Sequence, residues 1–347
     1  MNDDALRFGI IGAGGIARSY GLAFAECQDA RLVAVADVRP EAAQALAEVF
    51  GCKHFSSYED MAEKTALDAV VVCSPPATHA AASIYFLERR MHVLCEKPFS
   101  VDVESAKRMV DTARRMRTRL TMASKFRFAE DVIRARSIVV SGILGEIVLF
   151  ENAFTSRIDM STRWNSDPEI SGGGVLIDNG THAVDLMRYF LGPLAEVQVV
   201  EGKRIQKLPV EDTVRIFVRS VSGVMGSSDL SWSIDKELDS YLMIYGSHGT
   251  VSVGWKESKY RQSSSREWIS FGKGYDKIQA FRRQIENFCR AIRGEDKLVI
   301  TPEDALASVE VVAAAYNALR RSQWTAVDHR REPLLEGIKL EPAIAAL

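Results

Sequence analysis

The sequence predicts an α/β protein of two domains, the first built on a parallel sheet and the second on a mainly antiparallel sheet that is open on one face. The chain has 347 residues, more than one ordinary hydrophobic core accommodates. Strand-like and helix-like segments alternate over residues 1–123, whereas residues 124–347 contain consecutive strand-like segments. Regular alternation is typical of a parallel sheet covered by helices, and consecutive strands are typical of an antiparallel sheet. We therefore place the domain boundary between Ala123 and Ser124.

In the first half, unbroken apolar runs predict strands, and segments of helical periodicity predict the helices between them. One helix follows Pro40 and stops at Gly51, and Asp102 is a plausible cap for another. Unbroken apolar strands are expected where helices cover both faces of a sheet. The expected strands are Arg7–Ile11, Leu32–Ala36, Ala69–Cys73, His92–Cys95 and Leu120–Ala123, and the expected helices are Ile16–Glu26, Glu41–Phe50, Ala77–Arg89 and Val103–Met116.

The second half follows a different pattern. A helix near Asp131–Val140 and a glycine turn lead into a strand, and a long irregular stretch, Thr155–Gly174, precedes an apolar helix over Val175–Leu191. Turn residues then separate several strand-like segments. The expected strands are Ile147–Phe154, Ala195–Glu201, Thr213–Val221, Val224–Ile234, Ser240–Tyr245 and Thr250–Val253, and the last expected helices are Ile278–Ile292 and Pro302–Arg320.

Composition and charge argue against several classes of function. The formal net charge of −2 gives no support to binding of nucleic acid or of a membrane surface. No apolar stretch approaches the roughly 20 residues of a membrane span. The five cysteines are widely spread, without metal-ligand spacing, and indicate reduced thiols. Because the sequence also begins without a basic and apolar leader pattern, we expect a cytoplasmic protein.

A glycine-rich loop predicts a dinucleotide site. Gly12-x-Gly14-x-x-Ala17 follows an expected strand and opens an expected helix, which is the context that the motif requires. Gly12 permits the tight turn, Gly14 lets the backbone approach a pyrophosphate, and Ala17 allows close packing of helix on strand. The helix N-terminus offers free N–H groups to the phosphates. We expect Gly15 and Ile16 to complete this cofactor-binding loop.

Asp37, at the end of the next strand, favours NAD as the cofactor. A carboxylate at this position accepts the two ribose hydroxyls and repels a 2′-phosphate. Arg39 could pair with that phosphate or stack on adenine, or it could be a solvated loop cation. NAD is therefore favoured and NADP is not excluded.

Two further strands end in polar residues that we expect to border the cofactor, because ligands bind at the carboxyl ends of parallel strands. These ends are Cys73-Ser74-Pro75-Pro76 and Cys95-Glu96-Lys97-Pro98. Lys97 is held in a fixed direction by the following proline, and the bond between them could be cis. Its ammonium group could bind a reacting hydroxyl; the alternative is an exposed lysine on a turn.

A second polar cluster lies within the apolar helix Val175–Leu191. Asp178 and His182 are four residues apart and share a helix face with Asp185. A histidine with a carboxylate one turn away can act as a general base. A polar patch with only a structural role is the alternative, and a metal site is not expected, because no further ligand is evident nearby. Asp185 is expected to be structural.

The motifs described so far form, with several others, a pattern that covers nearly the whole chain. The pattern consists of Gly9–Ala17, Cys95–Pro98, Arg127-Phe128, Gly142–Ile147, Ser171–Asp178 and Gly180-x-His182-x-x-Asp185. With these motifs the chain resembles the Gfo/Idh/MocA oxidoreductases, which include glucose–fructose oxidoreductase and inositol dehydrogenases. The resemblance implies a Rossmann domain and an α/β domain whose large, open, mainly antiparallel sheet packs against its counterpart in a homodimer or homotetramer. It also implies reversible hydride transfer between a nicotinamide and a secondary hydroxyl of a sugar, cyclitol or related polyol.

The resemblance also implies a role for individual residues. Lys97 contacts the reacting hydroxyl, His182 acts as acid and base, and Asp178 orients His182 or the substrate. Four residues are expected beside the nicotinamide, namely Ser74, Pro75, His79 and Glu96.

Two positions depart from the family's usual residues. Lys125 stands where a small amide is frequent, and Asn179 replaces a more common apolar residue. Both are expected near the substrate, where Lys125 could recognise an acidic group or could form a surface salt bridge. Trp164 could form a wall of the sugar pocket or be ordinary packing.

Three hypotheses of function follow. The first is an NAD-preferring dehydrogenase of a sugar or cyclitol. The second is a non-catalytic sensor that binds dinucleotide and sugar, against which the presence of Lys97 and His182 argues. The third is an enzyme that retains its cofactor and uses transient oxidation for glycoside cleavage or epimerisation.

Overall fold

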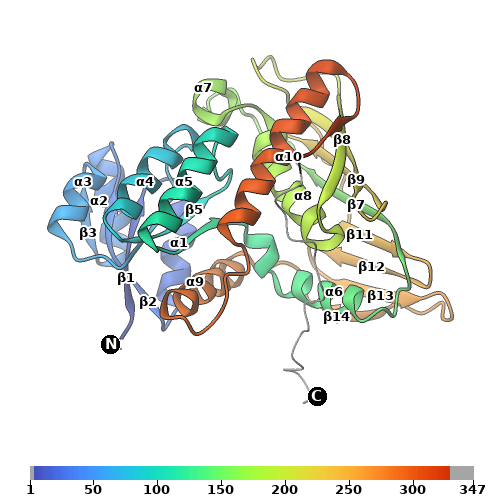
Figure 1. Ribbon diagram of the computed structural model, residues 1–347, viewed down its shortest axis with the longest axis horizontal. Helices are drawn as coiled ribbons and strands as arrows, with labels where there is room; N and C mark the ends of the chain where they lie inside the picture. Colours follow the sequence, from blue (N-terminus) through green and yellow to red (C-terminus); the bar gives the residue numbers. More distant parts are fainter. Residues whose placement is uncertain (1–3, 329–347) are drawn as a thin grey trace.

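The computed structural model describes residues 4–328, so the ends of the two predicted domains, residues 1–3 and 329–347, lie outside the described residues. Figure 1 shows two sheets side by side, one in each half of the molecule, with helix α10 (Pro302–Arg321) between them. This helix contacts α5 (Val103–Met116) of the first half and α8 (Val175–Leu191) of the second.

The first half contains a six-stranded parallel sheet in the order β3-β2-β1-β4-β5-β6. Successive strands are added on one side of β1 up to β3 and on its other side from β4 onward. The boundary between β1 and β4 is therefore the topological switch point, where open α/β sheets bind ligands. The strands are β1 Leu6–Ile11, β2 Ala30–Ala36, β3 Lys53–Phe55, β4 Ala69–Val72, β5 His92–Glu96 and β6 Leu120–Ala123, and the helices are α1 Gly15–Ala25, α2 Pro40–Phe50, α3 Tyr58–Lys64, η1 Pro76–Thr78, α4 His79–Glu88 and α5 Val103–Met116.

The second half contains a nine-stranded sheet in the order β14-β13-β12-β11-β7-β10-β9-β8-β15, in which only the β7–β10 pair is parallel among the described strands. The predicted α/β class, with a mainly antiparallel second sheet, is therefore confirmed. Its strands are β7 Ile147–Thr155, β8 Leu194–Glu201, β9 Thr213–Ser220, β10 Met225–Ser231, β11 Ser240–Gly246, β12 Gly249–Gly254, β13 Ser258–Gln262, β14 Ile269–Gly272 and β15 Thr325–Ala326. Its helical segments before the sheet's later strands are η2 Lys125–Phe128, α6 Glu130–Val140, η3 Trp164–Ser166, α7 Pro168–Ser171 and α8 Val175–Leu191.

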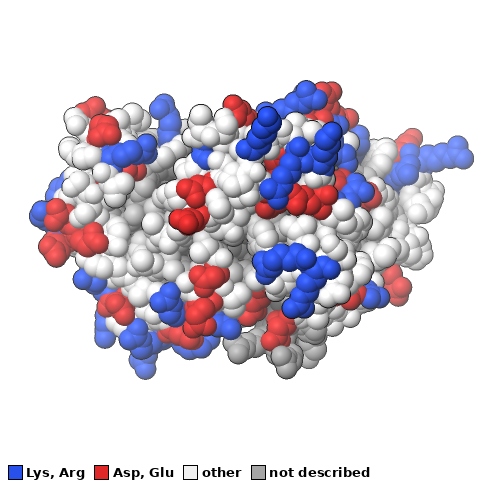
Figure 2. All heavy atoms as spheres, turned by 90° about the horizontal axis from the view of Figure 1, so that it is seen from above, with Lys and Arg blue, Asp and Glu red and all other residues white. Residues whose placement is uncertain are grey.

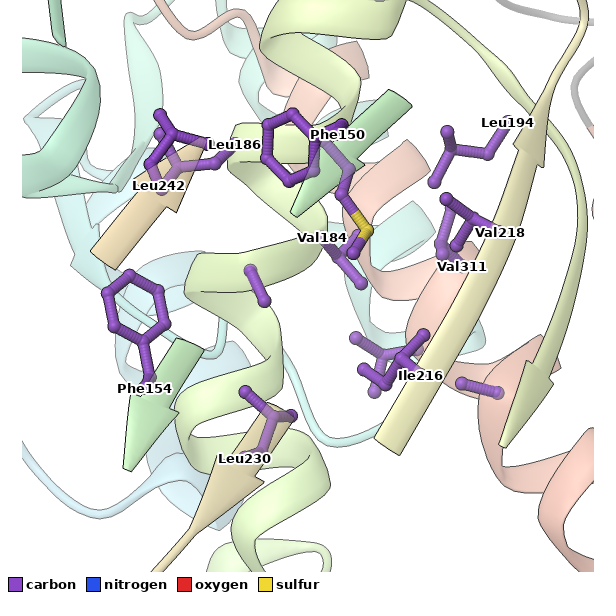
Figure 3. Close-up of a cluster of buried hydrophobic side chains, with 14 of the residues drawn as sticks. Phe150, Phe154, Val184, Leu186, Leu194, Ile216, Val218, Leu230, Leu242 and Val311 are labelled. Atoms are coloured by element: carbon purple, nitrogen blue, oxygen red, sulfur yellow. The ribbon is translucent and has the colours of Figure 1, made fainter. Parts of the chain in front are cut away.

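One face of the second sheet is covered and the other is open. Figure 3 shows Val184 and Leu186 of α8 packed with Phe150, Ile216 and other side chains of the sheet. Residues of β9 alternate between buried and exposed or partly exposed positions. This alternation is typical of a sheet with one solvent-facing side.

The sequence analysis missed several short elements. Lys53–Phe55 is a three-residue edge strand without an apolar pattern, and Ser258–Gln262 is a polar strand near the other sheet's edge. Periodicity cannot identify strands of this kind, because it detects the burial of a face and these strands have little buried surface.

Helix α9 (Lys277–Arg293) packs against α1 and extends the core of the first half. The ring of Phe288 lies 6.2 Å from that of Phe8, and the ring of Phe281 lies 4.5 Å from that of Tyr20. The division of the chain near residue 123 remains a prediction. Segments beyond that position share the core of the first half, among them α9 and the start of α10 with Ala305, Leu306 and Val309.

The charge distribution agrees with the near-neutral composition. On the face shown in Figure 2, basic and acidic side chains are interspersed, with uncharged surface between them. A continuous basic surface is what nucleic-acid binding requires. None of the helices in the described part of the chain is long and apolar enough to cross a membrane.

Substitution Phe288→Ala should test the contribution of α9 to the first core. Phe288 is fully buried, so the substitution should lower the free energy of unfolding by about 3–5 kcal/mol. Urea unfolding followed by circular dichroism measures the loss, with Ile133→Ala, at a 39% exposed residue, as a control. A loss below about 1 kcal/mol for Phe288→Ala would contradict this reading of α9.

Candidate active site

Gly12 allows the tip of β1 to approach the tip of β4. Its φ is +93°, and a Cβ atom there would lie 2.7 Å from the backbone nitrogen of Ser74. Both the left-handed conformation and the close approach require glycine. The two strands on either side of the topological switch point are thereby drawn together.

Gly14 and Gly15 leave open space at the N-terminus of α1. A Cβ atom at either position would meet no atom within 4 Å, and Gly14 caps the helix without any side-chain hydrogen bond. The first backbone N–H groups of the helix, which include that of Ile16, have no intrahelical partner. Open space, free donors and the positive end of the helix dipole fit the pyrophosphate of a dinucleotide.

Asp37 is fixed beside this loop. Its Oδ2 accepts a hydrogen bond from the backbone N–H of Ala13 at 2.7 Å, and its Oδ1 accepts one from the N–H of Arg39 at 2.9 Å. A carboxylate has about four acceptor positions, so lone pairs remain for two ribose hydroxyls. The side chain of Arg39 is 64% exposed, with its Nε 3.4 Å from Oδ1 of Asp37. The arginine side chain is therefore largely exposed and only weakly held by Asp37.

His79 joins the tips of β4 and β5. Its Nδ1 lies 2.8 Å from the carbonyl oxygen of Pro98, and its Nε2 lies 2.8 Å from that of Ser74. The ring is only 1% exposed, and burial lowers its pKa. Both ring nitrogens face carbonyl oxygens, and the neutral ring donates to one of them, so His79 links the segment around Pro75 to the cis Lys97–Pro98 bond. The Ser74 hydroxyl in this segment is partly exposed and accepts a hydrogen bond from the Thr78 hydroxyl at 2.7 Å.

Glu96 is buried at the end of β5, and each of its carboxylate oxygens accepts a hydrogen bond. Its Oε1 accepts from the Tyr20 hydroxyl at 2.9 Å, and its Oε2 accepts from the backbone N–H of Lys97 at 3.0 Å. Gln284 of α9 donates to the Tyr20 hydroxyl at 3.0 Å. Burial raises the pKa of Glu96, while the nearby lysines oppose that shift. Sequence reasoning did not identify Tyr20 or Gln284, because 264 residues separate them and only the packing of α9 brings them together.

Lys97 and Asp178 form an ion pair between the two halves of the chain. The ammonium group donates to Oδ1 of Asp178 at 2.6 Å and to the backbone oxygen of the same residue at 3.0 Å. The side chains are 17% and 23% exposed. Asp178 was expected to orient His182 or the substrate; in the structure its carboxylate bonds Lys97 and no described bond joins it to His182. The charged ammonium group is a stronger partner for a carboxylate than a neutral imidazole is.

His182 lies one turn further along α8 in aromatic surroundings. It is 7% exposed, and its Nδ1 is buried without a hydrogen-bond partner among the described residues. The ring of Phe126 contacts it edge-on at 5.1 Å, and that of Phe154 lies at 6.3 Å. Burial, and after it the charges of Lys97 and Lys125, hold the pKa of His182 well below its ordinary value. The imidazole is therefore neutral near pH 7 and able to accept a proton.

Asp185 has the structural role that was expected. Its Oδ1 pairs with Nη2 of Arg127 at 2.7 Å, and its Oδ2 accepts from the Ser124 hydroxyl at 2.5 Å. Arg127 and Asp185 are both buried. This pair ties α8 to the segment that follows β6.

The N-terminus of α8 is held by a residue that sequence reasoning missed. Glu211 accepts from the backbone N–H groups of Gly174 and Leu176 at 3.0 and 3.1 Å, and from the Tyr316 hydroxyl at 2.8 Å. A Cβ atom at Gly174 would overlap the carbonyl oxygen of Glu211, which explains the glycine at that position. The sequence around α8 gave no sign of this cap, because Glu211 lies 37 residues beyond Gly174 along the chain.

The three remaining predicted substrate residues have different surroundings. Lys125 is partly buried, with its Nζ 5.5 Å from the ring centre of Phe126, so it is not part of a surface salt bridge. The amide nitrogen of Asn179 donates to the carbonyl oxygen of Phe154 at 3.2 Å. Trp164 is 45% exposed in η3, with no described contact to Lys97 or His182.

An aromatic cluster that was not anticipated adjoins His182. The rings of Tyr275 and Phe126 stack at 5.1 Å, Trp255 lies 4.5 Å from Tyr241, and Trp255 is 41% exposed. Exposed aromatic faces of this kind suit the apolar faces of a sugar ring. Within residues 4–328, no group of histidine, cysteine and carboxylate side chains is arranged to hold a metal ion.

Substitution Gly14→Val should separate cofactor binding from folding. The position has a φ of −77° and space around it, but valine is a poorer N-cap than glycine, so stability should fall by about 1 kcal/mol while the added side chain occupies the phosphate site. NADH should raise the melting temperature of the unmodified protein and leave that of Gly14→Val unchanged. A variant that binds NADH with undiminished affinity would refute the assignment of this loop.

The chain is similar to several enzymes whose activities are named. Inositol 2-dehydrogenase of Rhizobium meliloti is 26% identical over 342 residues, which cover 93% of this chain and 99% of that enzyme. D-glucoside 3-dehydrogenase of Escherichia coli is 37% identical over 223 residues, 62% of each chain. The crystal structure of levoglucosan dehydrogenase with NADH and levoglucosan shares the fold, with a TM-score of 0.86, 21% identity and coverage of 93% and 99% of the two chains.

Two family models match in succession. Residues 6–124 match the model described as "Oxidoreductase family, NAD-binding Rossmann fold", and residues 132–252 match the "GFO/IDH/MocA C-terminal domain". Together they include the glycine loop, Lys97 and the α8 cluster. The chain therefore belongs to the Gfo/Idh/MocA family and is an NAD(P)-dependent oxidoreductase.

Proposed function

We propose that the protein is an NAD-preferring dehydrogenase that interconverts a secondary hydroxyl and a carbonyl on a sugar, cyclitol or related polyol. The observation that carries the proposal is the Lys97–Asp178 pair, which joins the tip of β5 to α8 one turn from a neutral His182. The activities for which the relatives are named, on inositol and on a glucoside, support this class of substrate.

Each polar group of the site has a task in the oxidative direction. The ammonium group of Lys97 donates to the reacting hydroxyl oxygen and stabilises its alkoxide character, while Asp178 holds Lys97 in place. His182 accepts the hydroxyl proton. When bound, the nicotinamide supplies the C4 position that would receive the hydride from the carbon that bears the reacting hydroxyl. That carbon, having lost a hydride while its hydroxyl lost a proton, becomes the carbonyl carbon of a ketone.

Residues around this centre shape the pocket. Asn179 uses its amide nitrogen on the Phe154 carbonyl and keeps its own carbonyl oxygen for a substrate hydroxyl. Trp164 is proposed as a further wall, contributed by the irregular segment whose helix α7 contacts η1 beside the cofactor. Trp255 lies on the rim of the aromatic cluster and is an additional candidate for stacking on a sugar ring.

The open face of the second sheet is the proposed contact between subunits of a cytoplasmic homodimer or homotetramer. Tyr245, Leu149 and Met225 are neighbours in one cross-strand row, and Met225 is 59% exposed. Apolar side chains in a row on a flat sheet face favour pairing with a second copy.

The two other functions make different predictions for one experiment. Mixing the pure protein with NAD and a panel of sugars, inositols and sugar acids should produce net NADH if it is a dehydrogenase. Absence of turnover with NADH still bound after purification would favour the enzyme that retains its cofactor. Absence of both turnover and bound NADH would favour a sensor.

Substitutions Lys97→Ala and His182→Ala should each lower kcat by about 10²- to 10⁴-fold, the usual contribution of a positioned proton-transfer group. The affinity for NADH, measured by fluorescence titration, should stay within a few-fold of that of the unmodified protein. Undiminished turnover in both variants would overturn the assignment.

The pH profile of kcat/KM for oxidation should reflect a neutral His182. Because burial holds the pKa of this group well below about 6.5, the loss of activity on acidification should occur below that pH. The same shift makes folding less favourable as pH falls below about 6.5, since only the unfolded chain then binds the proton readily. An acid limb at or above pH ~6.5 would contradict the assignment, and the exposed His54→Gln variant should leave the profile unchanged.

A further inference from the structure

We propose that this site is built for a substrate that carries an anionic group, a carboxylate or a phosphate, and that Lys125 is the residue that binds it. The inference rests on the proposed function in that it concerns the same pocket. It concerns which sugars or cyclitols enter that pocket, not the reaction.

Lys125 lies at the start of η2, directly after the last strand of the parallel sheet. Its Nζ is 5.5 Å from the ring centre of Phe126, which in turn contacts His182, and 5.9 Å from that of Phe281. The charge of Lys125 is also close enough to oppose protonation of His182. The ammonium group thus lies close to His182 of α8 and to Phe281 of α9.

The carboxylates around Lys125 already have other partners. Glu96 accepts from Tyr20 and from a backbone N–H group, and Asp178 accepts from Lys97. Within residues 4–328, no carboxylate lies within ion-pair distance of Lys125. Lys277 adds another positive charge nearby, with its Nζ 5.9 Å from the ring centre of Phe281. The pocket therefore contains more cationic than anionic charge.

A lysine removed from water without a counterion is unfavourable, and aromatic faces offset only part of that cost. Burial, and after it repulsion from Lys97, lowers the pKa of Lys125 to about 8, as expected of an ammonium group that lacks a partner. An anionic substrate group supplies that partner. The cofactor phosphates do not, because their place is at the N-terminus of α1, where Gly14 and Gly15 leave the space open.

Matched ligands test the proposal on the NADH-loaded protein. Isothermal titration compares glucose with glucuronate and glucose 6-phosphate, and myo-inositol with an inositol monophosphate. At least one anion should bind about 10- to 100-fold more tightly than its neutral counterpart, the effect of one charge-assisted contact. Preference for glucuronate would identify a carboxylate, and preference for a monophosphate would identify a phosphate.

Three variants identify the residue responsible. Lys125→Met should abolish the preference for the anion and leave the affinity for the neutral ligand within a few-fold, and Lys125→Arg should retain part of the preference. Lys273→Met removes an equal charge from an exposed residue and should have no effect. For the unmodified protein, affinity for the anion should fall as pH rises through about 8, while affinity for the neutral ligand should not.

Equal affinity for neutral and anionic ligands, a preference that survives Lys125→Met, or no binding of any anion would overturn the proposal. If the protein oxidises neutral polyols and shows no preference for anionic ligands, the proposal for Lys125 is overturned and the dehydrogenase function stands. Binding of an anion that depends on Lys125, without turnover of any substrate, would support this site and reject the dehydrogenase function.

Discussion

The position of α8 depends on the buried ion pair between Arg127 and Asp185. Arg127 follows the last parallel strand, and Asp185 lies three residues beyond His182. A buried ion pair contributes little net stability, yet losing one partner leaves an uncompensated buried charge. The pair therefore fixes the rotation and register of α8 against the first half. Asp304 of α10 adds contacts to Arg127 and Arg188, so three segments distant in sequence meet at this point.

With α8 fixed in this way, the distances between the charged groups of the site determine which of them form pairs. Lys97 takes Asp178 as its partner, Glu96 bonds Tyr20 and the backbone, and Lys125 keeps no carboxylate among the described residues. His182 remains neutral because it is buried near two ammonium groups. A neutral base beside a fixed cation is the arrangement that oxidation of an alcohol requires, since the base must accept a proton while the cation stabilises negative charge on oxygen.

The two halves share more than the ion pair between Lys97 and Asp178. Helix α9 lies far along the chain, yet Phe281 and Phe288 are part of the core under the parallel sheet, and Gln284 supports the hydrogen bonds of Glu96. A change in the packing of α9 would therefore reach the cofactor side through Tyr20. This arrangement couples the packing of the first core to the geometry at the tip of β5.

The sequence by itself determined the longer elements, the parallel first sheet and the glycine loop that follows its first strand, because these depend on local periodicity and short motifs. It also singled out the candidate polar residues of the site. Helices Val103–Met116 and Val175–Leu191 were predicted to the residue. Short polar edge strands were missed, since they bury no continuous face. Only the tertiary structure decided which groups pair. The Lys97–Asp178 contact spans 81 residues, the Tyr20–Gln284 contact spans 264, and the unpaired state of Lys125 follows from what surrounds it in space. Such pairings depend on distance and burial, which no local pattern of residues encodes.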